Sequence, residues 1–426
     1  MRLLIVVALL AVAASPSHAQ DRLTGHWKGH WSRAGDTMVV TMNVTRDTAQ
    51  KYVATFDADR LRVSGIPFAD VQVQGCCNVT LTLRGDRTTL VFNGTLRGDS
   101  LTGTFREESS EGRFAFVRIA AEKPLFEERA LTFSNGPVTL AGTLLLPRGV
   151  PPVPAVVFAH GSGAEGRWAS RFLASQLASR GVAALIFDKR GVGGSTGDWR
   201  TATLEDLAAD VAAAVARLRD EPRIDRQRIG IHGHSQGGTL APFIVARSQG
   251  IAFVIGSAAA GVPMDSSEIF SILNSILPAA TTRADTVEAR AFVDELVAVA
   301  YHGRPRARLD SLAQSMRGRL WYFELPAADA SYWSFSRVYA AYQPLEWWAR
   351  VRVPVLLIYG AADHRVPAAE SAARIAGTLI RAGNGDVTVR ILPDADHTFR
   401  LPPGPGGWPV TAPAYIATLL DWIARR

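Results

Sequence analysis

The segment IGIHGHSQGG, residues 229–238, decides the fold of this chain. Its first four residues are typical of a short, buried strand, and the residues after it have helical character. Between them, GHSQGG places Ser235 in a G-x-S-x-G turn. Glycines allow a turn tight enough to expose a serine hydroxyl above a sheet, and the following helix directs its first N–H groups at the same point. The segment predicts strand, sharp turn and helix, with Ser235 as candidate nucleophile.

A serine hydroxyl at its ordinary pKa is a poor nucleophile, so Ser235 needs an imidazole as base and a carboxylate to orient that imidazole. Asp363 follows the predicted strand 355–359, and His397 follows the last predicted strand, 387–391. Both groups therefore come after strands, downstream of the serine. Their order and placement predict a Ser235, Asp363, His397 triad.

Two alternatives within the chain stay open beside this triad. Asp394 or Asp396 could orient the imidazole in place of Asp363, although both precede His397 too closely for an easy reach across a site. A second G-x-S-x-G string, residues 193–197, contains Ser195. It lies beyond its nearest strand and before a helix, so we interpret it as a loop.

A tetrahedral intermediate also requires hydrogen-bond donors for its oxyanion. The backbone N–H of Gln236, directly after the candidate nucleophile, is one donor. The second is expected from the loop HGSG, residues 160–163, which follows the predicted strand 155–159 and offers the N–H of Ser162. The side chains of His160 and Ser162 either shape this loop or support the chemistry.

These motifs resemble those of the α/β-hydrolase superfamily, in its bacterial exported carboxylesterase and serine-peptidase-like branch. The resemblance covers about residue 130 to the C-terminus and rests on HGSG, on FDKRGVG (187–193), on GHSQGG, and on Asp363 and His397. It implies an eight-stranded, mostly parallel sheet flanked by helices, with a helical cap inserted after the sixth strand. It also implies Ser-His-Asp acyl transfer without a cofactor, and a structural role for Asp188.

Within that superfamily the nucleophile narrows the chemistry, because Ser235 stands where haloalkane dehalogenases and epoxide hydrolases carry Asp and dienelactone hydrolases carry Cys. We therefore expect hydrolysis of carboxylic esters, with a small-molecule ester as substrate. Serine aminopeptidase or oligopeptidase action on short peptides is the alternative. An aromatic-rich cap favours apolar short- to medium-chain or aryl esters.

Two other classes of function compete with the hydrolase. GSGAEG, residues 161–166, matches G-x-G-x-x-G after a strand, and Asp188 ends the next strand, which is the dinucleotide-binding pattern of an oxidoreductase. That interpretation would leave the serine turn, Asp363 and His397 as coincidences. A non-catalytic binding protein would leave the complete triad without a purpose.

Two domains are expected from the patterning. Residues 20–120 alternate apolar and polar side chains, with Gly-Asp pairs at 85–86 and 98–99 between the runs, which predicts a small antiparallel β barrel or sandwich. From 129 to 426, apolar strands alternate with helices and predict an α/β domain. Residues 261–350 interrupt this rhythm and predict the cap insertion, whose aromatic residues form a core, line a pocket, or both.

The first 19 residues have the pattern of a cleavable signal peptide. Arg2 is followed by an apolar run over residues 3–14, and small residues Ser17 and Ala19 precede the expected cleavage site. The apolar run is too short to span a bilayer of about 30 Å as a helix, so no stable membrane anchor is expected. We expect a secreted or periplasmic protein.

The remaining composition excludes other partners. The net charge of +7 comes from scattered Arg residues without a basic block, so no nucleic-acid binding is expected. The only cysteines, Cys76 and Cys77, are neighbours and cannot form an ordinary disulfide, which favours two free or unusually oxidised thiols. No metal-ligand spacing is present, and no metal is expected.

Overall fold

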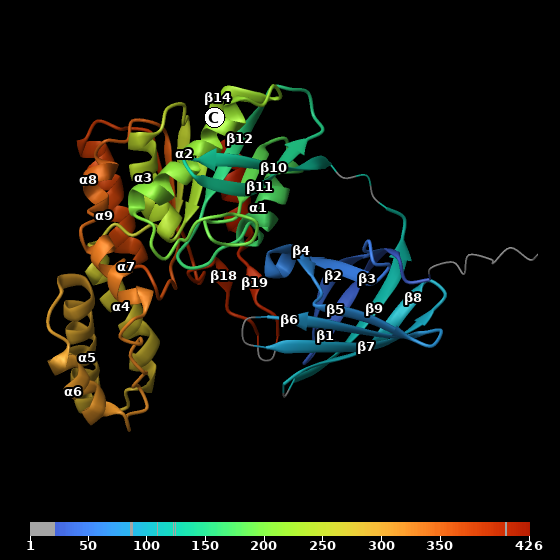
Figure 1. Cartoon of the computed structure of the whole chain (residues 1–426), viewed down its shortest axis with the longest axis horizontal. Coiled ribbons are helices and arrows are strands. Elements are labelled where there is room, and N and C mark those ends of the chain that lie inside the picture. The colour runs from blue at the N-terminus through green and yellow to red at the C-terminus, as the bar shows by residue number, and fades with distance from the viewer. Residues whose placement is uncertain (1–21, 86–87, 109, 122, 124, 405–406) are drawn as a thin grey trace, which may run out of the picture. The chain divides into compact units, whose positions relative to one another are not determined.

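The computed structural model describes residues 22–85, 88–108, 110–121, 123, 125–404 and 407–426. The predicted signal peptide lies outside these residues, so its existence and its cleavage stay predictions. The chain divides into two compact units (Figure 1). Of the described residues, the first unit holds those up to Asp57 and those of 66–121, and the second holds Ala58–Gly65 and those from 123 onward. The segment Ala58–Gly65 therefore belongs to the second unit, although it lies within residues 20–120, the range predicted to form the β domain.

The N-terminal region forms one nine-stranded sheet, in the order β4-β3-β2-β1-β9-β8-β7-β6-β5. Along this order, every pair of adjacent strands from β3 through to β5 at the far edge is antiparallel, as the alternating pattern predicts. Its strands are β1 (Gly25–Arg33), β2 (Asp36–Arg46), β3 (Tyr52–Ala58), β4 (Val63–Pro67), β5 (Asp70–Gln74), β6 (Asn78–Arg84), β7 (Thr89–Arg97), β8 (Ser100–Glu107) and β9 (Ser110–Ile119).

This sheet curls around an aromatic core. Trp31 on β1 and Phe92 on β7 have ring centroids 4.8 Å apart, although β9 and β8 lie between their strands. In a flat sheet, three strand spacings would separate them by about 14 Å. Both rings are almost fully buried, as are Trp27, Phe105 and Phe116. The predicted barrel or sandwich is therefore a single curled sheet with β4 and β5 at its two edges.

The two cysteines of this unit take the second of the two states that the sequence leaves open, unusual oxidation in place of free thiols. Cys76 and Cys77, in the turn between β5 and β6, are joined to each other by a disulfide. The bond closes between neighbouring residues and links no separate parts of the chain. It is thus an unusual oxidised form and not a disulfide that cross-links the fold.

The second unit contains an eight-stranded sheet in the order β10-β11-β13-β12-β14-β15-β16-β17. β10 and β11 are antiparallel, β11 also runs antiparallel to β13, and the other pairs are parallel. This confirms the predicted mostly parallel sheet. The strands are β10 (Phe126–Asn135), β11 (Val138–Pro147), β12 (Val153–Ala159), β13 (Ala183–Phe187), β14 (Ile224–His234), β15 (Phe253–Ser257), β16 (Val355–Gly360) and β17 (Val387–Leu392).

Helices cover both faces of this sheet. In β12, Val157 packs into one buried cluster, with α2 (Leu204–Arg219), α3 (Gln236–Arg247) and α9 (Ala368–Arg381). Its neighbours Val156 and Phe158 pack into the opposite cluster, with α1 (Trp168–Ala178) and α10 (Pro413–Ile423). Successive side chains of a strand point to opposite faces, which explains why the central strands are apolar throughout. The predicted helix after Thr203 is present, and Thr203 and Asp206 form its capping box.

The expected insertion lies between β15 and β16 and is helical. It consists of α4 (Met264–Ile276), a 3-10 turn (Leu277–Ala279), α5 (Arg283–His302), α6 (Ala307–Met316), α7 (Ser331–Ala340) and α8 (Pro344–Trp348). In Figure 1, α5 and α6 lie at the end of the cap that is remote from the sheet. Phe292, Trp321 and Trp333 belong to a buried cluster of the cap's own. A short ribbon of β18 (Arg400–Leu401) and β19 (Val410–Thr411) follows the last strand of the main sheet.

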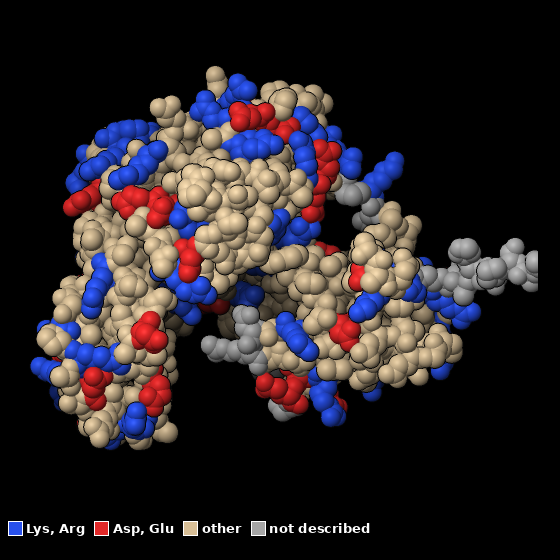
Figure 2. Space-filling model, viewed as in Figure 1, with Lys and Arg blue, Asp and Glu red and all other residues tan. Residues whose placement is uncertain are grey.

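Charges of both signs are interspersed on the visible surface of each unit (Figure 2). Across the part of the chain that the structure describes, no helix has the length and apolar character needed to cross a bilayer.

Candidate active site

The predicted triad residues follow three parallel strands of the main sheet. Ser235 follows β14, Asp363 follows β16, and His397 follows β17. The carboxyl ends of parallel strands meet at one edge of a sheet, so residues far apart in sequence gather there. This arrangement brings together all three side chains that the sequence analysis selected.

Ser235 occupies a strained turn between β14 and α3. Its φ of 56° and ψ of −115° lie in a region that residues with a Cβ rarely adopt. Glycines on both sides make the turn possible: a Cβ on Gly233 would lie 2.2 Å from the carbonyl carbon of Gly237, and one on Gly237 would lie 2.5 Å from the carbonyl oxygen of Ala159. The turn therefore holds the hydroxyl at the start of α3.

The three side chains form a continuous chain of hydrogen bonds. Asp363 Oδ2 lies 2.8 Å from His397 Nδ1, and His397 Nε2 lies 3.0 Å from Ser235 Oγ. A carboxylate only accepts hydrogen bonds, so Nδ1 carries the proton and Nε2 is free to accept from the serine hydroxyl. The fully buried Asp363 side chain also accepts from the backbone N–H groups of Arg365 and Val366 through Oδ1. Its orientation is thereby fixed.

The residues of the two expected oxyanion donors line the same pocket as Ser235. Gln236 is the first residue of α3, so its N–H is among the first-turn groups that have no acceptor within the helix. Ser162, Ser235 and Gln236 line one pocket. The structure thus brings Ser162 and Gln236, whose backbone N–H groups are the expected oxyanion donors, to one pocket with the candidate nucleophile.

Two charged side chains that were not predicted from the sequence support the loop HGSG, residues 160–163. Lys189 Nζ donates to the carbonyls of Gly161 and Gly163, at 2.9 and 3.1 Å, and to Oε1 of Gln236 at 3.0 Å. Glu165 accepts from the Gly161 N–H at 2.6 Å. Burial lowers the pKa of Lys189 to about 8 and raises the pKa of Glu165. A single ammonium therefore connects both segments that carry the expected oxyanion donors.

The pocket beside Ser235 is small, with a volume of about 140 Å³. The cap contributes Met264 and Ser267 from α4 and Phe335 and Tyr339 from α7. Both roles expected for the aromatic residues of the cap are present: Tyr339 lines the pocket, whereas Trp321 and Trp333 belong to the cap's own core. Within the described residues, no cluster of three or more His, Cys, Asp or Glu side chains could hold a metal ion.

Comparison with protein families assigns the chain. Residues 150–401, more than half of its length, match the profile of the hydrolase family described as serine aminopeptidase, S33. The chain is an α/β hydrolase of this family. The matched region contains every residue of the predicted triad and both expected oxyanion donors.

Individual relatives of this hydrolase match over shorter stretches. Esterase EstD of Thermotoga maritima is 31% identical over 181 residues, 40% of this chain and 42% of EstD. The uncharacterized protein PA2218 of Pseudomonas aeruginosa is 35% identical over 135 residues, 31% of this chain and 36% of that protein. The chain thus spans about two fifths of the length of these curated relatives. Among solved structures, the esterase Pf2001 of Pyrococcus furiosus aligns with a TM-score of 0.45 and 18% identity, covering 72% of this chain and 92% of Pf2001.

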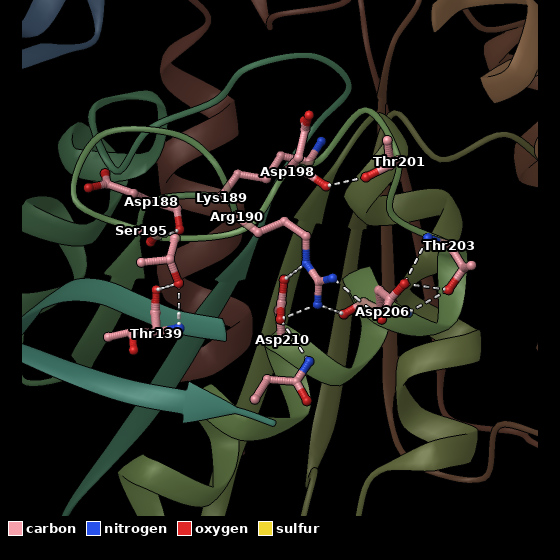
Figure 3. Close-up of polar contacts among 12 residues, drawn as sticks. Thr139, Asp188, Lys189, Arg190, Ser195, Asp198, Thr201, Thr203, Asp206 and Asp210 are labelled. Carbon is pink, nitrogen blue, oxygen red and sulfur yellow. Dashed lines mark hydrogen bonds and ion pairs between the residues drawn. The ribbon is translucent and has the colours of Figure 1, made fainter. Parts of the chain in front are cut away.

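The second G-x-S-x-G string of this hydrolase lies in a structural loop (Figure 3). Ser195 is buried, donates to the Asp188 carbonyl at 2.7 Å and accepts from the Ala141 N–H at 2.9 Å. The carboxylate of Asp188 is held by Arg167 and by the backbone N–H of Gly194. Ser195 is therefore not placed as a nucleophile, and Asp188 is engaged by protein groups where a dinucleotide site would need it free for a ribose.

Two histidines near the candidate triad, His234 and His160, hydrogen-bond to backbone carbonyls. His234 Nε2 lies 2.9 Å from the carbonyl oxygen of His397. Burial, then the neighbouring His397, lowers the pKa of His234 to about 4, so it donates to that carbonyl as a neutral imidazole. His160 bonds the Phe187 carbonyl and shapes its loop, again as a neutral ring because burial lowers its pKa to about 4. His234 adjoins the nucleophile in sequence, which is the one signal that could have selected it.

Proposed function

We propose that this α/β hydrolase cleaves carboxylic esters through an acyl-enzyme intermediate on Ser235. The observation that carries the proposal is the hydrogen-bond chain from Asp363 through His397 to Ser235 Oγ. Similarity to esterase EstD supports the choice of esters, although the match spans 42% of that protein.

The reaction follows from the positions of these groups. His397 Nε2 takes the hydroxyl proton as Ser235 Oγ attacks the ester carbonyl, and Asp363 stabilises the imidazolium that forms. The backbone N–H groups of Ser162 and Gln236 hold the negative oxygen of the tetrahedral intermediate. The imidazolium then protonates the leaving alcohol. Water, deprotonated by the same imidazole, cleaves the acyl-enzyme, and the acid leaves with Ser235 restored.

The dimensions of the pocket point to a short acyl group. Its volume of about 140 Å³ is below the roughly 300–1,000 Å³ of pockets that hold drug-sized ligands. Its wall mixes apolar groups such as Met264 and Phe335 with polar ones such as Ser267 and Glu268. We therefore infer short-chain esters of small molecules as substrates, in place of the broader range that the aromatic composition of the cap favours.

Amide hydrolysis is the second candidate function, because the matched family carries the description serine aminopeptidase. The triad chemistry is the same, with His397 protonating an amine leaving group. A panel of p-nitrophenyl esters and aminoacyl p-nitroanilides separates the two. Because an activated ester is intrinsically far more reactive than an anilide, each kcat/KM is divided by the uncatalysed hydrolysis rate of its substrate. A larger rate enhancement on the esters supports the first proposal, and a larger one on the anilides supports the second.

A fluorophosphonate probe tests the nucleophile directly, because it reacts with an activated serine whatever acyl group the enzyme prefers. We expect modification at Ser235, located by peptide mapping, and none in Ser235→Ala. The matched control is Ser195→Ala, which removes the hydroxyl of the other G-x-S-x-G string and should label normally. A folded protein that is not modified at Ser235 would contradict the proposal.

We also propose that the protein is exported to the periplasm or secreted, on the pattern of its first 19 residues. Expression of the full chain in a bacterial host, followed by mass spectrometry of the product, tests this. The expected product begins at Gln20, and a cytoplasmic product that retains Met1 or Arg2 would contradict the proposal.

A further inference from the structure

A short segment from the N-terminal region of the chain belongs to the hydrolase unit. Ala58–Gly65 includes a 3-10 turn, Asp59–Leu61, and Arg62 directly after it. Arg62 has a left-handed backbone, with φ of 57°, and its N–H closes the turn on the Asp59 carbonyl at 3.0 Å. This backbone reverses the chain and leaves the Arg62 side chain at the end of the turn.

The backbone of this segment is bound to residues that follow the last strand of the main sheet. Arg400 donates to the Leu61 carbonyl at 3.4 Å, and the Thr411 hydroxyl donates to the Arg60 carbonyl at 3.3 Å. In return, Arg60 donates to the carbonyl of Trp408 at 3.0 Å. Contacts from both sides therefore hold the segment against the ribbon of β18 and β19.

Arg62 bonds the loop that carries His397. Its Nη1 donates to the carbonyl of Thr398, the residue after the histidine. Its guanidinium carbon lies 4.8 Å from the ring centroid of Tyr415, within the range of a cation–π contact. Tyr415 in turn stacks on Phe399, with ring centroids 3.9 Å apart and an interplanar angle of 6°. Arg62 thus contacts the loop directly and also contacts the ring on which the loop packs.

Further contacts support the loop that carries His397. His234 donates to the His397 carbonyl at 2.9 Å. Asp396 Oδ1 accepts from the N–H groups of Thr398 and Arg400, both at 2.8 Å. Two successive carbonyls are therefore held by different side chains. His234 holds that of His397, and Arg62, 336 positions earlier in the chain, holds that of Thr398.

We propose that Arg62 is a positioning residue for His397: by holding the Thr398 carbonyl, it keeps Nε2 of the imidazole within hydrogen-bond reach of Ser235 Oγ. The role is indirect, because Arg62 is not among the described residues that line the pocket beside Ser235. The inference rests on the proposed function, in which His397 is the base. It assigns the N-terminal region a part in catalysis through one side chain.

The size of the effect follows from the geometry that proton transfer requires. Nε2 and Oγ are 3.0 Å apart, and a displacement of about 1 Å at a reacting group can lower the rate about 100-fold. We therefore expect Arg62→Ala to lower kcat about 10- to 100-fold. KM should stay close to that of the unchanged protein, because the walls of the pocket are retained.

The experiment compares Arg62→Ala with Arg60→Ala in the full chain. Both changes remove a guanidinium from the same segment and a hydrogen bond to a backbone carbonyl, but the carbonyl that Arg60 bonds is that of Trp408, outside the loop of His397. We expect kcat to fall in Arg62→Ala and to stay within about twofold in Arg60→Ala. Guanidinium ion, which can occupy the space left by the side chain, should restore part of the kcat of Arg62→Ala alone.

Equal losses of kcat in the two variants, or a loss that guanidinium does not reduce, would overturn the inference in favour of a general structural role. If Arg62→Ala does not fold, Arg62→Met replaces it, because methionine keeps a long unbranched side chain but has no donor for the Thr398 carbonyl; unchanged kcat there would also overturn the inference. Fluorophosphonate labelling of the unchanged protein keeps the two proposals apart. Failure to label Ser235 would overturn the proposed function and this inference with it, whereas normal labelling with unchanged kcat in folded Arg62→Ala would overturn the inference alone.

Discussion

Replacement of Asp363 by Asn tests the triad through the position of a single proton. The two side chains have nearly the same shape, so the change leaves the packing of this buried site in place. In the structure, Oδ1 of Asp363 accepts from the N–H groups of Arg365 and Val366, at 2.7 and 2.9 Å. An amide in this position keeps its oxygen toward these two donors, because the reverse orientation would bring N–H groups against N–H groups.

The NH₂ group of the amide in Asp363→Asn therefore faces Nδ1 of His397, where the carboxylate oxygen now lies at 2.8 Å. The NH₂ group is a donor, so Nδ1 must become the acceptor and the ring proton moves to Nε2. Nε2 then donates to Ser235 Oγ and has no lone pair with which to take the hydroxyl proton. The variant holds the correct geometry with the wrong tautomer.

We expect kcat to fall about 10⁴-fold, as for the same change in a serine-protease triad, which corresponds to about 5.4 kcal/mol in the barrier. Release of p-nitrophenol from a short-chain ester measures the rate, and circular dichroism establishes that the variant is folded. The rate of fluorophosphonate labelling should fall in parallel, since it depends on the same proton transfer.

Asp394→Asn is the matched control, because Asp394 is exposed and is one of the alternative orienting acids that precede His397. It should retain the kcat of the unchanged protein. If Asp363→Asn kept more than about a tenth of the activity, the tautomer argument and the assignment of Asp363 would both be wrong. A large loss in Asp394→Asn would move the orienting role to that residue.

Two further predictions concern the groups around the site. Ser195→Ala should lower the free energy of unfolding by about 1–3 kcal/mol, because the Ala141 N–H loses its acceptor. Urea titrations measure this change, and kcat per folded molecule should stay unchanged. Reduced kcat with unchanged stability would contradict the prediction. Burial lowers the pKa of Lys189 to about 8, so above that pH the amine has two N–H donors for the three oxygens that its ammonium now contacts. We expect kcat to fall as pH rises through about 8, and we expect Lys189→Met to have a lower kcat without this alkaline limb; an identical limb in both proteins would refute the assignment.

The fold of the second unit could be predicted because its signals are local. Apolar strands such as residues 183–187 alternate with capped helices such as the one after Thr203, and each signal lies within a few residues. The placement of the candidate triad followed from the same pattern, since residues after parallel strands share one edge of the sheet. Strand ends were less accurate: β14 begins at Ile224, ahead of the apolar run from Ile229 that predicts it.

The supports of the site could not be predicted, because they depend on contacts between distant parts of the chain. Nothing in the sequence around Arg62 indicates that it bonds Thr398, and Lys189 contacts Gln236 across 47 positions. The curl of the N-terminal sheet likewise depends on rings that meet across several strands, whereas alternation reports only which side of a strand faces inward.

The cap has a buried cluster of its own, built from residues such as Phe292 and Leu296, while the triad depends on the edge of the main sheet. Side chains of α4 and α7 that face the pocket, among them Ser267 and Phe335, belong to the cap, whereas the hydrogen bonds of the candidate triad join Asp363, His397 and Ser235. Among the described residues, no side chain of α4 or α7 hydrogen-bonds to any of these three. On the proposed function, the acyl preference is therefore the property to alter by directed evolution: libraries confined to the pocket face of these two helices change the walls around Ser235 and leave its hydrogen bond to His397 in place.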